Sequence, residues 1–185
     1  RGVKCDKELV FAPTMGMNWY GYQQLDQDYG RYGNADINVY LRFRNEQKNG
    51  LGMPLPAGRF RVMQRDSADD SLEFIGEDVI DHTPRNEEVR ITMGNAFDVV
   101  GERTQTDYRI IADNVFESEF EIKIRNHKES HITLDIVEPM PHDWEILKKS
   151  HDFEKKDAHT AVFSVTAGVS SMSSSAMARS SAKAR

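Results

Sequence analysis

The sequence has few of the features that would crosslink a chain, anchor it in a membrane or attract nucleic acid. Cys5 is the single cysteine, which excludes an intrachain disulfide. No segment approaches the roughly 18 consecutive apolar residues of a membrane-spanning helix. Acidic residues outnumber basic ones, 30 to 24, and the net charge of −6 gives no footprint for nucleic acid. We therefore expect a globular chain held together by an apolar core, with no nucleic-acid partner and no membrane span.

The sequence also lacks the apolar period of about 3.6 residues that marks an amphipathic helix. Apolar and polar residues alternate instead, which is the pattern of half-buried strands. The clearest examples are residues 37–44, 88–93, 120–125 and 132–137. Strand centres lie about 10 to 15 residues apart with turn signals between them, as in β-sandwiches. We predict an all-β fold, an antiparallel β-sandwich of immunoglobulin-like type.

Two predicted strand endings resemble each other. Residues 41–48 and 122–128 both end a strand, leave it through an asparagine and enter a charged turn. Asparagine suits such an exit because it tolerates positive φ and hydrogen-bonds to nearby backbone groups. The similarity has two explanations: a duplicated sandwich unit, or two strands that end alike by chance.

Composition divides the chain into three parts. Residues 1–36 hold an N-terminal strand and a loop rich in glycine and aromatic residues, and residues 37–165 carry the alternating pattern of the sandwich domain. A duplication would split that domain into two fused units, 37–110 and 115–165. Residues 166–185 are rich in serine and alanine and contain no aromatic residue, so we predict a disordered tail.

The glycine-aromatic loop, residues 15–36, is the strongest candidate for ligand binding, because it is too long for an ordinary connection. Its large aromatic residues are Trp19, Tyr20, Tyr22, Tyr29 and Tyr32. Such side chains are suited to stacking on sugar rings or packing against other protein chains. The alternative is that these aromatic residues fold back onto the sandwich.

No combination of residues indicates catalysis, a metal or a cofactor. His127 and His131 have the spacing of a zinc motif, but they flank a predicted turn and do not share a helix face. Cys5 has Lys4 and Lys7 nearby, and lysine neighbours can lower a thiol pKa, but no motif places a base beside it. The nucleophile elbow and the phosphate-binding loop are both missing. We assign no catalytic residue, no metal ligand and no cofactor, and expect a protein that is not an enzyme.

Three stretches carry a resemblance to a known family. They are a Pro-Ala-Gly strand entry at 55–62, a segment over 80–99 with His-Thr-Pro and Gly-Asn-Ala motifs, and a segment at 141–158 around Trp144. Together they resemble the domain of unknown function 4139 family, the C-terminal part of mucoidy-inhibitor-A-like bacterial proteins. The resemblance implies an exported chain, in the periplasm or at the cell surface, without agreed catalytic residues.

Two structural expectations follow from these stretches. Trp144 alternates with Ile146 and is expected to pack between sheets as a core anchor. The last strand of the family pattern looks replaced by the serine-rich tail after Val165, which would leave a sheet edge open. An open edge can pair with another chain, and residues 160–168 or 8–11 would supply or receive that strand.

The function expected from the sequence is that of a non-enzymatic β-sandwich module of an exported bacterial protein. Its task would be adhesion, scaffolding or assembly, and its partner would be a second copy or another protein chain, bound through a sheet edge. The alternative is an accessory domain that binds or processes carbohydrate through the aromatic loop at 15–36.

Overall fold

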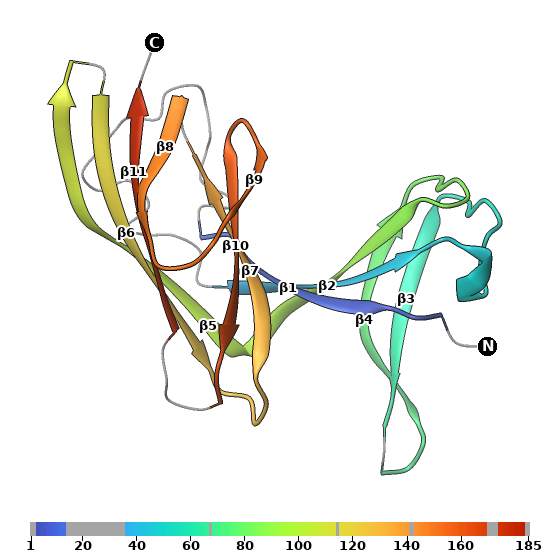
Figure 1. The fold of residues 1–185 in the computed structure, drawn as a ribbon. Helices are drawn as coiled ribbons and strands as arrows, with labels where there is room; N and C mark the ends of the chain where they lie inside the picture. Colours follow the sequence, from blue (N-terminus) through green and yellow to red (C-terminus); the bar gives the residue numbers. More distant parts are fainter. Residues whose placement is uncertain are drawn as a thin grey trace. The chain divides into compact units, whose positions relative to one another are not determined.

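The computed structural model describes residues 3–13, 36–66, 68–113, 115–140, 143–169 and, as backbone alone, 174–183. These ranges form strands and turns (Figure 1). The strands are β1 (Asp6–Phe11), β2 (Asp36–Arg44), β3 (Gly58–Arg65), β4 (Leu72–Ile80), β5 (Glu88–Ala112), β6 (Val115–Asn126), β7 (Ile132–Pro139), β8 (Asp143–Lys149), β9 (Glu154–Asp157), β10 (Thr160–Ala167) and β11 (Ser174–Lys183). Helical structure in these ranges is confined to the 3₁₀ turn η1 (Gln47–Asn49), so the predicted all-β class is confirmed. The described residues include no helix with the length and apolarity needed to cross a bilayer.

Hydrogen bonds join nine strands into one sheet and two strands into another. The order in the large sheet is β8-β11-β6-β5-β2-β1-β7-β10-β9, and β3 pairs with β4 in the small sheet. Pairing is mostly antiparallel, as predicted. Among the pairings with a described register, β1 differs: it runs parallel to β7 and places Val10 opposite Asp135.

The chain divides into two compact units. Unit 1 holds residues 1–9 and 38–95, and unit 2 holds residues 10–37 and 96–185. Strands β1, β2 and β5 contribute residues to both units, since each crosses one of these boundaries. The boundaries fall at other residues than those of the two fused units suggested by the internal similarity.

The core of unit 1 is small and apolar. It consists of Phe43, Ile80, Val89 and Ile91, from β2, β4 and β5. Val89 and Ile91 are two positions apart in β5, so they lie on the same face of that strand, as the alternation predicts. Partly buried side chains pack around this cluster, among them Leu41, Leu51, Leu55, Phe60, Val62 and Met93.

Asn45, directly after β2, is fully buried and ties three segments of unit 1 together. Its Nδ2 donates hydrogen bonds to the carbonyl oxygens of Met53, at 2.7 Å, and Pro84, at 3.0 Å. Its Oδ1 accepts the N–H of Gly52 at 2.9 Å. The side chain thereby satisfies backbone groups that irregular segments would otherwise bury without partners.

Asn126, the last residue of β6, has the same role in unit 2 and is also buried. Its Nδ2 donates to the carbonyl oxygens of Ser130, at 2.8 Å, and Gly168, at 2.9 Å. Its Oδ1 accepts the N–H of Lys128 at 3.0 Å, which forms a local turn.

The similar strand endings seen in the sequence thus have a common structural basis. Asn45 and Asn126 both end a strand and use a buried amide to fix the turn that follows. Neither has a positive φ, since Asp70 and Asn86 are the non-glycine residues with positive φ in the described part of the chain. The strand exit through asparagine is confirmed, but buried hydrogen bonding explains it and backbone tolerance does not.

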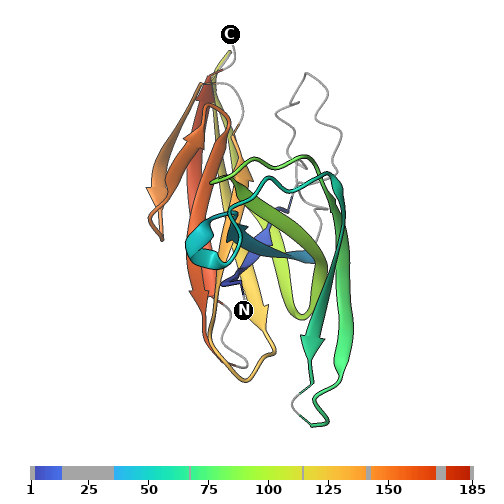
Figure 2. The same ribbon diagram turned by 90° about the vertical axis from the view of Figure 1, so that its right-hand side faces the viewer.

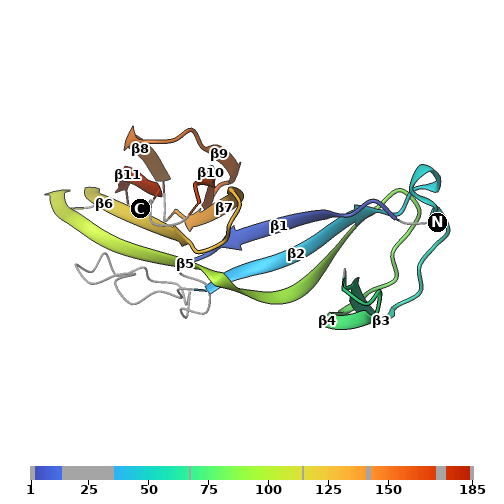
Figure 3. The ribbon, with the colours of Figure 1, turned by 90° about the horizontal axis from the view of Figure 1, so that it is seen from below.

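The core of unit 2 lies between rows of alternating apolar residues. The buried rows are Phe120, Ile122 and Ile124 of β6, Ile132, Leu134 and Ile136 of β7, and Ala161, Phe163 and Val165 of β10. In this unit β5 and β6 lie on one side and β7, β9 and β10 on the other (Figure 3). Strand β10 also approaches β6 and β11, so the sheet curls over its own core.

Phe11 is fully buried in this core, beside Gly101 of β5. A Cβ at position 101 would lie 2.4 Å from the Phe11 ring, so the close approach of β1 requires glycine there.

The strands at the two edges of the large sheet, β8 and β9, meet through Trp144. Its indole Nε1 donates to the carbonyl oxygen of Ala158 at 2.7 Å, and the Nζ of Lys155 lies 4.5 Å from its ring centroid. The centroid of its ring system lies 6.1 Å from the ring centroid of Phe153. The Phe153 centroid lies in turn 5.6 Å from that of Phe163, in the core. Trp144 is half-buried, so the prediction of an enclosed core anchor is wrong. The side chain joins two edges, where its N–H finds a partner.

The serine- and alanine-rich segment contains a strand where composition predicts disorder. Strand β11 pairs antiparallel with β6 on one side and with β8 on the other. Ladder hydrogen bonds use main-chain groups, so small residues can form such a strand once neighbours flank it. Strand β10 is likewise paired on both sides, by β7 and β9, and does not present the open edge expected at 160–168.

We expect Asn45→Ala to lower the free energy of unfolding by about 1 to 3 kcal/mol, because it leaves buried carbonyl and N–H groups without partners. Asn49→Ala is the matched control, since Asn49 makes one exposed hydrogen bond, to the carbonyl oxygen of Arg44. Asn49→Ala should lower the free energy of unfolding by no more than about 0.5 kcal/mol. Urea unfolding followed by circular dichroism measures both, and equal effects would contradict the role of the buried amide.

Candidate interaction surface

The two-stranded β3–β4 sheet, here called the ribbon, is anchored to unit 1 near its base. Phe60 and Val62 of β3 pack against the unit 1 core. Gly76 of β4 lies so close to β5 that a Cβ there would be 3.3 Å from the carbonyl oxygen of Met93. These contacts define the inner face of the ribbon, and its opposite side is the outer face.

Asp78 of β4 adds a polar anchor at the same place. Its Oδ2 accepts the backbone N–H of Thr92 in β5 at 2.7 Å, and its Oδ1 accepts that of Val79 at 2.8 Å. These hydrogen bonds lower the pKa of the Asp78 carboxyl, and the one from Thr92 contributes most. The carboxylate therefore satisfies a main-chain donor on β5 that no strand of the ribbon pairs with.

A β-bulge changes which residues face outward in the distal half of the ribbon. Val62 is opposite Gly76, but the next residue, Met63, is opposite Phe74, so Ile75 has no partner on β3. Residues directly opposite each other share a face, and Met63 alternates with the inner residue Val62. The extra residue therefore places Phe74 on the outer face, where strict alternation from Gly76 would have turned it inward.

The outer face is apolar and exposed as a result. Fractional exposure is 59% for Leu72, 56% for Phe74, 44% for Met63 and 64% for Val79. The inner face at the same level carries the polar pair Gln64 and Glu73 instead. The turn of the ribbon projects from the rest of unit 1, away from η1 (Figures 1 and 2). Large exposed apolar side chains grouped on one face are typical of interaction surfaces, which makes the outer face the candidate surface.

Charged residues are distributed unevenly along this outer face. At the base, Arg59 and Arg61 share one acid, Glu77. At the turn, Nη1 of Arg65 lies 2.7 Å from Oδ2 of Asp70. Two further acids, Asp66 and Asp69, also lie in the turn. Hydrogen bonds from Ser71 lower the pKa of Asp69. The base is therefore net basic and the turn net acidic, with the apolar residues between them.

The ligand-binding residues expected from the sequence lie outside the described ranges. These are Trp19, Tyr20, Tyr22, Tyr29 and Tyr32. Their role in stacking on a sugar or a protein chain stays a prediction.

The residues considered for metal binding or nucleophilic catalysis are not gathered into a site. Partial burial, with a contribution from Asp6, raises the pKa of the Cys5 thiol, so the lysine neighbours do not lower it here. His82 is exposed and its Nδ1 accepts the N–H of Ala57 at 3.2 Å. In the described part of the chain, no three histidine, cysteine or acidic residues come together as a metal site.

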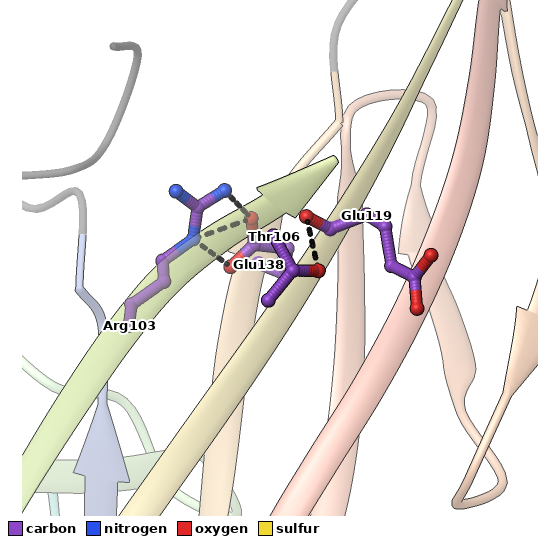
Figure 4. Close-up of polar contacts among 4 residues, drawn as sticks. All are labelled: Arg103, Thr106, Glu119 and Glu138. Carbon is purple, nitrogen blue, oxygen red and sulfur yellow. Dashed lines mark hydrogen bonds and ion pairs between the residues drawn. The ribbon is translucent and has the colours of Figure 1, made fainter. Parts of the chain in front are cut away.

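A buried ion pair in unit 2 is the polar group that sequence analysis missed (Figure 4). Nε of Arg103 in β5 donates to both carboxylate oxygens of Glu138 in β7, at 3.0 and 3.1 Å, and Nη2 donates to one of them. Both side chains are almost fully buried, and the guanidinium lies 3.6 Å from the ring centroid of Phe120. Because partners and an aromatic ring enclose both charges, the pair links β5 to β7 across the core and offers no access to a substrate.

Two neighbours of this pair on β5 are also polar. The Gln105 side chain buries its oxygen and nitrogen without a hydrogen-bond partner in the described structure, which costs stability. Thr106 lies at a register shift and donates its hydroxyl to the carbonyl oxygen of Glu119 on β6 at 3.2 Å (Figure 4).

Comparison of the chain with family models gives no match, and comparisons with curated proteins and with solved structures give none either. The resemblance to the domain of unknown function 4139 family therefore stays a prediction.

We expect Asp78→Ala to lower the free energy of unfolding by about 1 kcal/mol at neutral pH, through loss of hydrogen bonds to an ionised acceptor. The folded-state pKa of Asp78 lies below its ordinary value, so its contribution is complete above the unfolded pKa. It is lost as the pH falls through the folded pKa. Denaturant unfolding across acidic pH should therefore show the difference from wild type shrinking toward low pH. A difference that does not change with pH would contradict this role of the carboxylate.

We expect Glu138→Gln to lower the free energy of unfolding by about 3 to 5 kcal/mol, because Arg103 would remain charged and buried without its charged partner. The double variant Arg103→Met/Glu138→Leu removes both charges and should recover most of that loss. Thermal and urea unfolding of the three proteins tests this. A Glu138→Gln variant as stable as wild type would show that the pair is not enclosed.

Proposed function

We propose that this chain is a non-enzymatic binding module of an exported bacterial protein, acting in scaffolding or assembly by contacting other protein chains. The proposed architecture is an immunoglobulin-like β-sandwich, and the proposed family is that of domain of unknown function 4139. The curled sheet of unit 2, with rows of buried residues on facing strands, supports the sandwich. The periplasmic or cell-surface location rests on the family resemblance.

The observation that carries the proposal is the outer face of the ribbon. A two-stranded sheet alone is marginally stable in water, and such sheets normally turn apolar residues toward a core. Here Met63, Leu72 and Phe74 are exposed while the polar pair Gln64 and Glu73 takes the inner face. This arrangement costs stability in an isolated chain unless another surface covers the apolar side chains.

The proposal predicts that position 74 contacts a protein in the cell. A photo-reactive phenylalanine analogue at position 74 of the full chain, expressed in its source bacterium, should give covalent adducts with protein on irradiation. The same analogue at position 73 is the control, because Glu73 is also exposed but lies on the inner face. The adducts at 74 should disappear when Met63→Ser and Leu72→Ser are added.

Two results would argue against this function. Equal labelling at positions 73 and 74 would mean that the outer face has no special role. Adducts to glycan in place of protein would favour the carbohydrate-binding alternative.

A further inference from the structure

The two ends of the ribbon's outer face carry opposite net charge, so this face is electrostatically complementary to a second copy turned end for end. Along the hairpin the face is net basic at the base, where Arg59 and Arg61 share Glu77, and apolar in the middle, with Met63 and Phe74. It is net acidic at the turn, where three aspartates outnumber Arg65. Asp70 lies on this side of the turn, since it pairs with Arg65, which alternation places on the outer face. Two identical ribbons packed face to face in opposite directions would set each basic base against an acidic turn.

We propose that the occupant of this face is a second copy of the same chain, packed antiparallel across a two-fold axis. The proposal rests on the proposed function and names its partner. Each copy then contributes the same patch, as an isologous interface requires. The apolar residues of the two ribbons cover each other at the centre, and the charged ends form two equivalent contacts between Arg59 or Arg61 and the acids of the partner's turn.

The charges favour a second copy over a lipid surface. An anionic leaflet attracts clusters of basic residues, but here the projecting end of the ribbon is its acidic turn. The chain as a whole carries a net charge of −6, which adds to that repulsion. In the antiparallel pair, each acidic turn faces a basic group instead.

The small contact area of two ribbons makes the expected dimer weak and reversible. Sedimentation velocity over a wide range of protein concentration should show the wild type shifting from monomer to dimer. Phe74→Ser should raise the dimer dissociation constant at least tenfold, which corresponds to a loss of about 1.4 kcal/mol in binding free energy. Glu73→Ser, on the inner face, should leave the dissociation constant unchanged.

Charge reversal tests the antiparallel arrangement directly. The base-reversed variant Arg59→Glu/Arg61→Glu has an acidic base and an acidic turn. The turn-reversed variant Asp69→Lys/Asp70→Lys has a basic base and a basic turn. Each should remain monomeric alone, because like charges meet in its dimer, whereas an equal mixture of the two should form a heterodimer. Recovery in the mixture also shows that both variants fold.

The outcomes separate this inference from the function on which it rests. A wild type that stays monomeric at every concentration, or a mixture that does not associate, overturns the second copy as partner. If position 74 still forms adducts with a different protein, the binding function stands. If it forms none with any protein, the function fails as well.

Discussion

The alternation of side chains across a β-strand is the constraint on which the surface of this protein depends. Where alternation is kept, as in β6, β7 and β10, it buries one continuous row of apolar residues in unit 2. Where one residue is added, at Ile75, it exchanges the faces of the β4 residues beyond it. A single unpaired residue therefore places Phe74 and Leu72 on the exposed face, beside Met63.

Sheet edges are protected by side chains as much as by strand pairing. Asp78 accepts a main-chain N–H of β5, and Trp144 brings β8 and β9 together. Strand β9 is short and consists of charged residues, which is a common defence against unwanted strand addition. In the function proposed above, these covered edges leave the exposed face of the ribbon as the place where another chain would bind.

The sequence predicted what depends on local pattern. The strands follow from alternation, and the exits at Asn45 and Asn126 follow from residue type. Features that depend on distant neighbours were not predictable: β11 exists because β6 and β8 flank it, and the buried partner of Arg103 comes from β7. The bulge left a signal, since Phe74 and Ile75 are adjacent apolar residues in an alternating strand. Their exposure could not be read from the sequence, because it depends on where the unit 1 core ends.

The parallel pairing of β1 with β7 also constrains the order in which the chain folds. Val10 leaves the ribosome well before its partner Asp135, because the two lie far apart in the sequence. Closing so long a loop is slow, whereas the β3–β4 and β5–β6 hairpins need only local contacts. We therefore expect these hairpins to form first and β1 to join the sheet late, when Phe11 packs against Gly101. On that order, the nascent chain would carry the ribbon, with its outer face complete, before β1 joins the sheet.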